Sequence, residues 1–115
     1  MRKSDKKIDN QIREVLTTVC EQTLKEFQGF LWVTHSVDFN SFPQSLKIVC
    51  VFETNHDGEA FLDAGGEKKV SATIQAMFNQ VGIKLKNAAK HIHYDTQENC
   101  ERTHQGKWAV RLTTL

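Results

Sequence analysis

The sequence predicts an α+β protein, a two-layer α/β sandwich in which two helices cover one face of a small sheet. Two observations predict this fold class. Two long segments carry apolar residues at intervals of three and four, the spacing of an amphipathic helix. The segments beside them are short and rich in β-branched and aromatic residues, which is typical of strands. The expected order is α-β-β-α-β, with a possible last strand.

The two helices are expected over residues 5–27 and 67–82. Gly29 and Gly82 stand where each apolar pattern stops, a position at which glycine commonly ends a helix. Each helix then has one apolar side that needs cover from a sheet. The apolar stripes comprise Ile8, Ile12, Val15, Leu16, Val19, Leu24 and Phe27 in the first helix and Val70, Ile74, Met77, Phe78 and Val81 in the second.

The first two strands are expected over residues 30–39 and 45–54, separated by a segment that contains the sole proline, Pro43. A connection this short favours an antiparallel hairpin over a parallel crossover. The other expected segments are a third strand over 90–95, a possible fourth strand over 107–112, a loop with one helical turn over 55–66, and a short strand or extended connector over 83–86.

Length and composition indicate a single domain over residues 1–115, with residues 1–4 expected to be flexible. The formal net charge is +1, so any role with nucleic acid needs a local basic patch. The three cysteines are too few for a disulfide framework, and no secretory signal is present. No apolar run approaches the roughly 20 residues of a membrane span. We therefore expect a cytoplasmic protein with reduced thiols and no membrane partner.

Side chains alternate across a strand, so the sheet has a far face that points away from the helices. In the second strand, the bulkier set from Leu46 to Phe52 is expected under the helices. The opposite set leaves a far face too apolar to stay in contact with water. The expected covers are the chain's own C-terminal segment with Trp108, a second copy of the chain, or a ligand. The far face is predicted to carry Val49 and Val51 and five candidate binding residues, Phe30, Trp32, Lys47, His91 and His93.

Residues 91–104 concentrate three of the five histidines and one of the three cysteines. A zinc site is one hypothesis for this segment, because imidazole and thiolate are the usual zinc ligands. The alternative is a polar segment with exposed histidines and a free cysteine, since the spacing matches no established zinc signature. The four ligands of the zinc hypothesis would be His91, His93, Cys100 and His104.

A thiol enzyme is a further alternative. Cys100 would be the nucleophile, with His93 or His104 as the base and Asp95 as the orienting group. No strained elbow or glycine-rich oxyanion turn accompanies these residues, so we expect no enzymatic activity. The other two cysteines, Cys20 and Cys50, fall on core stripes and are expected to be small buried hydrophobic residues.

Two clusters of basic residues are candidate phosphate contacts. One opens the first helix, where a solvated tail is the alternative interpretation. The other lies beside the expected third strand. The two clusters comprise Arg2, Lys3, Lys6 and Lys7, and Lys84 and Lys86 with the nearby Lys90.

The segments "KSDKKIDNQIREVLTTVCEQTLKE", "SLKIVCVFET" and "YDTQENCERTHQGKWAVRL" together resemble a group of short uncharacterised bacterial proteins that often carry the label Fis-family transcriptional regulator. The likeness covers nearly the whole chain. A Fis-type regulator resembles a helical dimer that ends in a helix-turn-helix for the DNA major groove. Here the C-terminal third is expected as strand and loop, with Trp108 where the recognition helix would lie, so no residue is carried over from Fis.

The predicted order of elements is also similar to that of KH-type RNA-binding domains and of the small ribosome-binding factors built on them. KH domains clamp single-stranded RNA at a Gly-x-x-Gly loop. This chain has Gly65-Gly66 in roughly that place without the full motif, and a simple turn before the helix is the favoured interpretation. The likeness implies contact with RNA or the ribosome through basic residues.

The resulting hypothesis is a small non-enzymatic binding or regulatory protein that acts through the exposed sheet face. Nucleic acid and the ribosome are its candidate partners. A homo-oligomer is expected, and no cofactor other than the zinc of the alternative hypothesis.

Overall fold

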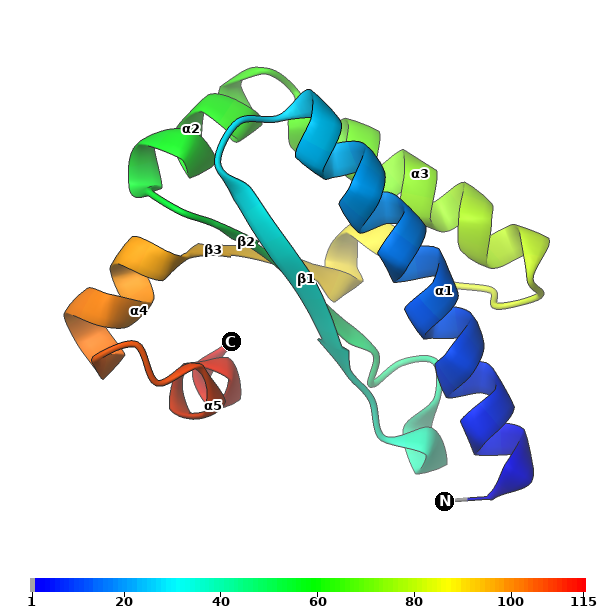
Figure 1. Ribbon diagram of the computed structural model, residues 1–115. Helices are drawn as coiled ribbons and strands as arrows, with labels where there is room; N and C mark the ends of the chain where they lie inside the picture. Colours follow the sequence, from blue (N-terminus) through cyan, green and yellow to red (C-terminus); the bar gives the residue numbers. More distant parts are fainter. Residues whose placement is uncertain (1) are drawn as a thin grey trace.

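The structure is a computed structural model that describes residues 2–115, and its strands form one three-stranded sheet (Figure 1). The expectation of flexibility over residues 1–4 falls partly on Met1, outside the described residues, whereas Lys3 and Ser4 already belong to the first helix. The helices and strands in chain order are α1 (Lys3–Glu26), β1 (Phe30–Ser36), β2 (Lys47–Phe52), α2 (Asn55–Asp63), α3 (Gly66–Gln80), β3 (Ile92–Thr96), α4 (Gln97–His104) and α5 (Trp108–Arg111), with short 3-10 turns η1 (Phe39–Ser41), η2 (Ala88–His91) and η3 (Leu112–Thr114).

The sheet has the order β1-β2-β3, so β2 is the central strand. β1 and β2 form the antiparallel hairpin that the sequence predicts. β3 runs parallel to β2, and the chain between them forms the crossover through α2 and α3 that a parallel pair requires. The α+β class is therefore confirmed.

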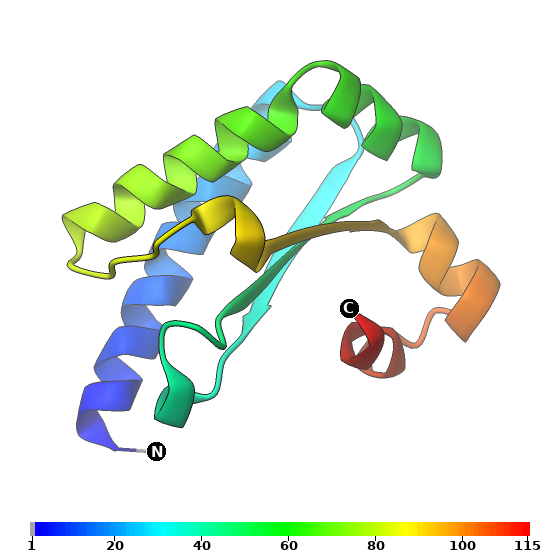
Figure 2. The same ribbon diagram turned by 180° about the vertical axis from the view of Figure 1, so that it is seen from behind.

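One core lies between the sheet and the two long helices, which lie side by side on the same face (Figures 1 and 2). Ile12 of α1, Ile48 of β2 and Ile74 of α3 are each 0% exposed. The strand set from Leu46 to Phe52 faces these helices, as predicted. Burial of this apolar surface is the main favourable term in folding.

The segment expected as a loop with one helical turn is the helix α2, so that expectation is wrong. Thr54 caps its N-terminus, because the Thr54 hydroxyl accepts a hydrogen bond from the backbone amide of Asp57 at 3.1 Å. The cap and the carboxylate of Asp57 in the first turn favour the helix. α2 ends in a tight turn into α3, where Gly65 adopts a positive φ of 76°.

The C-terminal third is also helical, so the possible fourth strand over 107–112 is wrong. Thr96 caps α4 by accepting a hydrogen bond from the Asn99 amide, and Gln105 and Gly106 end α4 in left-handed conformations. Trp108 and Arg111, three residues apart in α5, are both partly buried. A segment of five residues is too short for its spacing to distinguish a helix, in which residues three apart share a face, from a strand, in which residues two apart do.

Within the described residues, no helix combines the length and the apolar composition needed to cross a bilayer.

Gly66, at the turn between α2 and α3, is a position where one added methyl group is expected to destabilise the fold. A Cβ at Gly66 would lie 2.3 Å from the Phe61 ring. We expect Gly66→Ala to lower the free energy of unfolding by about 1–3 kcal/mol, because Phe61 is buried and cannot move away freely.

Gly58→Ala is the matched control, because a Cβ there meets Thr96 at an ordinary 3.4 Å. In the interior of α2 this substitution should stabilise by about 0.5–1 kcal/mol through helix propensity. Urea denaturation of both variants measures the two effects. Equal stabilities of the two variants would contradict the packing that we describe for Gly66.

Candidate functional site

The sheet face away from α1 and α3 is closed by the chain's own C-terminal residues. α4 and α5 lie on the opposite side of the sheet from the two long helices (Figures 1 and 2). The Trp108 ring meets the Trp32 ring edge-on, with centroids 4.9 Å apart. Val49 and Val51 are only 2% and 0% exposed. Among the three covers that we expected for this face, the structure contains the intramolecular one, and the face is not an open platform.

Phe30, predicted on the far face, lies in the core beneath the helices instead. A β-bulge between Phe30 and Trp32 shifts the alternation, so that Phe30 pairs with Phe52 and Trp32 with Val51. The Phe30 and Phe52 rings are 5.4 Å apart, and Phe30 is 4% exposed. The prediction for Phe30 is therefore wrong, because a strict two-residue period cannot anticipate a bulge.

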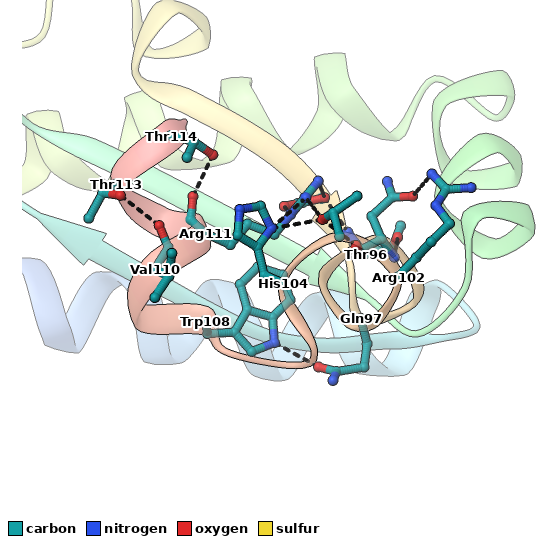
Figure 3. Close-up of polar contacts among 12 residues, drawn as sticks. Thr96, Gln97, Arg102, His104, Trp108, Val110, Arg111, Thr113 and Thr114 are labelled. Carbon is teal, nitrogen blue, oxygen red and sulfur yellow. Dashed lines mark hydrogen bonds and ion pairs between the residues drawn. The ribbon is translucent and has the colours of Figure 1, made fainter.

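The C-terminal cover is fastened by a buried ion pair between Asp95 of β3 and Arg111 of α5. Two parallel contacts join the side chains, from Nε to Oδ2 at 2.5 Å and from Nη2 to Oδ1 at 2.9 Å. Figure 3 shows the Arg111 end of this cluster and the Trp108 indole, which donates to Gln97 Oε1 at 2.7 Å. The side chains of Arg111 and Asp95 are 15% and 3% exposed. A paired guanidinium and carboxylate of this geometry is a strong, directional contact.

The same contacts set the charge of both groups. Burial raises the pKa of the Asp95 carboxyl, but hydrogen bonds from Arg111 and from the Thr96 amide outweigh burial, and the net pKa lies below the ordinary value. The hydrogen bond to Asp95 in turn raises the pKa of Arg111. Both side chains therefore remain charged at neutral pH, and the cover is held by a full ion pair.

The four residues of the zinc hypothesis do not converge. His91 Nδ1 lies 2.7 Å from the Leu46 carbonyl oxygen, and His104 lies beside Thr103 and Arg111 near the end of α4. Over residues 2–115, no group of three or more His, Cys, Asp or Glu side chains is arranged to hold a metal ion. Four ligand-type residues in a short stretch of sequence are here divided between a turn, a strand and a helix.

Cys100 does not have the properties of an activated nucleophile. It is 0% exposed, on the side of α4 that faces the protein interior. Burial raises the pKa of its thiol, whereas an activated thiolate needs a lowered pKa and access to substrate. Cys50 is equally inert, because burial raises its pKa to about 12. The expectation that Cys50 is a buried hydrophobic residue is confirmed by its 2% exposure.

A basic groove, by which we mean the depression between residues 43–47 and residues 84–93, is the site that emerges from the structure. Its volume is about 630 Å³. Its walls contain four lysines and two histidines and no carboxylate. Three of the lysines are exposed, and the fourth, Lys47, is half-buried. The charged and titratable side chains of the groove are Lys47, Lys84, Lys86, Lys90, His91 and His93.

The groove exists because residues 83–86 form an extended connector, one of the two structures expected there. Ile83 and Leu85 point into the core and are 4% and 6% exposed, so the alternating Lys84 and Lys86 point to solvent. The Gln75 side chain of α3 fixes this wall, because its amide donates to the Leu85 carbonyl at 2.9 Å. Its Oε1 also accepts from the Ala88 amide at 2.9 Å. The lysines therefore stand on a backbone that is tied to α3.

The opposite wall is tied to the first by a histidine. The contact between His91 Nδ1 and the Leu46 carbonyl joins η2 to the residue that precedes β2. Lys47, the next residue, begins β2 and pairs with Ser36. His93 pairs with Val49 in the register of β2 and β3 and thus lines the groove from the sheet. Lys47, His91 and His93 from the predicted far face and Lys84 and Lys86 from a predicted basic cluster meet in one place.

The other predicted basic cluster forms a shallower surface on α1. Arg2 is paired with Asp5 at 3.1 Å, so part of its charge is neutralised locally. The depression beside it has a volume of about 370 Å³ and includes Glu14 as well as the lysines of the first turns. Lys3, Lys6 and Lys7 are exposed there. This surface is less uniformly basic than the groove.

Comparisons of the chain with protein-family models, with curated proteins and with solved structures found no match.

The ion pair of the cover predicts the effect of removing one partner. Arg111→Ala leaves the Asp95 carboxylate buried without its cation, so we expect the free energy of unfolding at pH 7 to fall by about 3–5 kcal/mol. Arg102→Ala is the matched control, because Arg102 lies on the exposed side of α4 and its guanidinium donates an exposed hydrogen bond to Asn99 Oδ1 at 2.9 Å. Its effect should stay within about 0.5 kcal/mol.

The pH dependence of this loss has a definite sign. The folded state lowers the pKa of Asp95, so the ion pair stabilises the protein above the unfolded pKa of about 3.9 and loses its effect as the pH falls through the lower folded value. The stability difference between the parent chain and Arg111→Ala should shrink in that acidic range. Urea denaturation between pH 7 and pH 3 measures this difference. A difference that is constant over this range would contradict the charge assignment.

Proposed function

We propose that this chain is a small non-enzymatic binding protein that holds the phosphate backbone of a nucleic acid, with single-stranded RNA as the preferred class, in the basic groove. The observation that carries the proposal is a concave surface with four lysines and two histidines and no carboxylate. Lysine side chains that neutralise phosphates release condensed counterions, which supplies most of the affinity for a nucleic-acid backbone.

The positive charge of the groove contrasts with the charge of the rest of the molecule. The formal net charge of the chain is only +1, so the groove is a local excess and not part of a uniformly basic surface. Four other depressions on the described surface each include at least one carboxylate, such as Glu21 between α1 and β1 or Glu59 beside β3. A polyanion would meet repulsion in those places and none in the groove.

Single-stranded RNA is favoured over duplex DNA by the shape of the surface. Duplex recognition of the Fis type needs a protruding helix that enters the major groove. α5 spans only Trp108–Arg111, and both of these end residues are engaged with the rest of the protein. A concave groove accommodates a flexible strand better than a rigid duplex.

The likeness to KH-type domains supports the same class of ligand. The order α1-β1-β2-α2-α3-β3 contains a pair of helices joined by a glycine turn, where KH domains carry their Gly-x-x-Gly loop. Gly66 packs against Phe61 and Gly65 supplies the positive φ, so both glycines have structural reasons to be there. We therefore assign backbone contact to the groove and not to this turn. A ribosome-linked role follows from the likeness alone.

Self-association through the far face is not part of this proposal. The expected homo-oligomer would have used Trp32 and its neighbours, and Trp108 of the same chain packs against Trp32. The groove is complete within one chain, so the proposed binding needs no second copy.

The proposal predicts that two exposed groove lysines contribute to binding. In the variant with Lys84→Gln and Lys86→Gln, we expect the affinity for a labelled oligouridine of about 20 nucleotides to fall about tenfold at low salt. The slope of log affinity against log salt should become shallower by about 0.7 for each lysine removed. Fluorescence anisotropy between about 50 and 200 mM salt measures both effects.

The matched control carries Lys25→Gln and Lys68→Gln, which change the net charge equally but do not line the groove. We expect this control to lose little affinity, and duplex DNA to bind the parent chain more weakly than oligouridine. Equal losses in both variants would mean that binding depends on net charge alone. A parent chain that binds no oligouridine at about 50 mM salt would refute the proposed function.

A further inference from the structure

β1 forms one edge of the sheet, and within residues 2–115 only β2 pairs with it. In Figure 1, β1 lies in front of β2, with α1 along one side of it and α5 along the other, and neither helix crosses in front of β1. Residues 32–35 of β1 are only half-buried, whereas every residue of β2 after Lys47 is buried. The described part of the chain therefore leaves the outer edge of β1 uncovered.

The sequence of β1 favours pairing at this edge. The strand, "FLWVTHS", consists mainly of aromatic and β-branched residues and contains no lysine, no carboxylate and no proline. Charged residues and proline are the usual means by which proteins prevent an exposed edge from pairing with another strand. The bulge between Phe30 and Trp32 interrupts only the start of the strand. Residues 32–36 thus offer a regular row of backbone donors and acceptors.

A groove with a volume of about 560 Å³ follows this edge, between β1 and α1. A strand added to β1 would lie about 4.8 Å from it and would occupy this groove, as in complexes where a strand extends a sheet. The groove is lined by Arg13, Leu16, Thr17, Cys20 and Glu21 of α1 and by Trp32, Val33, Thr34 and His35 of β1.

The two ends of this groove carry opposite charges. α1 and β1 run antiparallel, because Asp9 Oδ1 lies 2.9 Å from His35 Nε2, while Cys20 lies close to the Val33 backbone. Arg13 therefore lies toward the His35 end of the groove, and Glu21 lies toward the other end. Both of these charged residues are exposed.

This distribution of charge fits a second copy of the same chain. When two β1 strands pair antiparallel about a two-fold axis, the His35 end of one copy lies beside the Trp32 end of the other. Arg13 of each copy is then on the same side as Glu21 of the other copy, which gives two equivalent attractions. Parallel pairing would instead place like charges beside one another. The groove is thus complementary to itself in the antiparallel arrangement only.

We propose that β1 pairs antiparallel with β1 of a second copy of this chain, so that two three-stranded sheets join into one continuous sheet. The two-fold axis passes near Val33 and Thr34, and α1 of each copy flanks the new strand pair. The contact uses the backbone edge of β1, which α5 leaves uncovered, and it shares no residue with the basic groove. The inference is therefore independent of the proposed function.

A lysine at the centre of the edge tests the pairing. In Thr34→Lys, two lysines would face one another across the axis, so we expect the dissociation constant of the dimer to rise about tenfold. Ala72→Lys is the matched control, because Ala72 is exposed on α3, away from β1, and the change in charge is the same. Analytical ultracentrifugation between about 1 μM and 1 mM protein measures both constants. Thermal unfolding establishes that each variant is folded.

Exchange of the two groove charges tests the antiparallel arrangement. Arg13→Glu alone and Glu21→Arg alone each place like charges together, and each should raise the dissociation constant about fivefold to tenfold. The variant with both substitutions restores two opposite-charge contacts and should dimerise within about twofold of the parent chain, as expected for residues that interact. A role of these residues in the fold of one chain would not produce this recovery.

Hydrogen exchange locates the contact in the parent chain. Amides of residues 32–35 should exchange more slowly as the protein concentration rises, while exchange in β3, at the other edge, should not change.

The remaining outcomes would each overturn the proposal. A parent chain that stays monomeric up to about 1 mM would exclude a second copy as the occupant and leave an extended segment of another protein as the partner of this edge. A dimer that responds to Thr34→Lys no more than to Ala72→Lys would use another surface. A dimer weakened by Thr34→Lys but not restored by the charge exchange would refute the antiparallel arrangement. Failure of oligouridine binding would leave this inference unaffected.

Discussion

The structure depends on closing the second face of the sheet. Val49 and Val51 lie in the central strand and are almost fully buried, so water must be excluded from both sides of β2. α1 and α3 cover only one side. Closing the other brings a carboxylate of β3, Asp95, into the interior, where an unpaired charge would cost several kcal/mol. Arg111 neutralises that charge, and it does so only when α5 is folded against the sheet. The ion pair and the Trp32–Trp108 contact therefore both require that α5 is folded against the sheet.

Because other elements cover both faces of the sheet, a binding surface on the sheet can form only at its edges and at the connections between strand ends. The basic groove lies at such a place, where β2 begins and where the chain returns from α3 to β3. Its rigidity comes from the alternation of buried and exposed residues in the connector. The apolar residues Ile83 and Leu85 anchor the backbone that carries Lys84 and Lys86. A binding surface is thus obtained from the same packing that completes the core.

The sequence pattern was sufficient to predict the two long helices, which have a strong apolar period, and to predict that the far face of the sheet is covered. The stripe through Ile12 and Ile74 indicated the two long helices, and the apolar character of Val49 and Val51 indicated that the far face needs cover. Three features were not accessible in this way. The bulge that turns Phe30 into the core breaks the two-residue period. α5 is too short for its period to be distinguished from a strand. The groove joins residues about 40 positions apart, and the composition of either segment alone does not indicate that they meet.

The position of Lys47 follows from the same alternation that buries the two valines. Residues 47, 49 and 51 share one side of β2, so an element that covers Val49 and Val51 also extends toward Lys47. Lys47 is the first residue of the strand, where the sheet ends and the groove begins. A lysine at this point has its apolar stem beside the covered face and its ammonium at the boundary with solvent. Contact between the cover and the groove is therefore a direct consequence of placing a lysine two residues before a buried valine in a central strand.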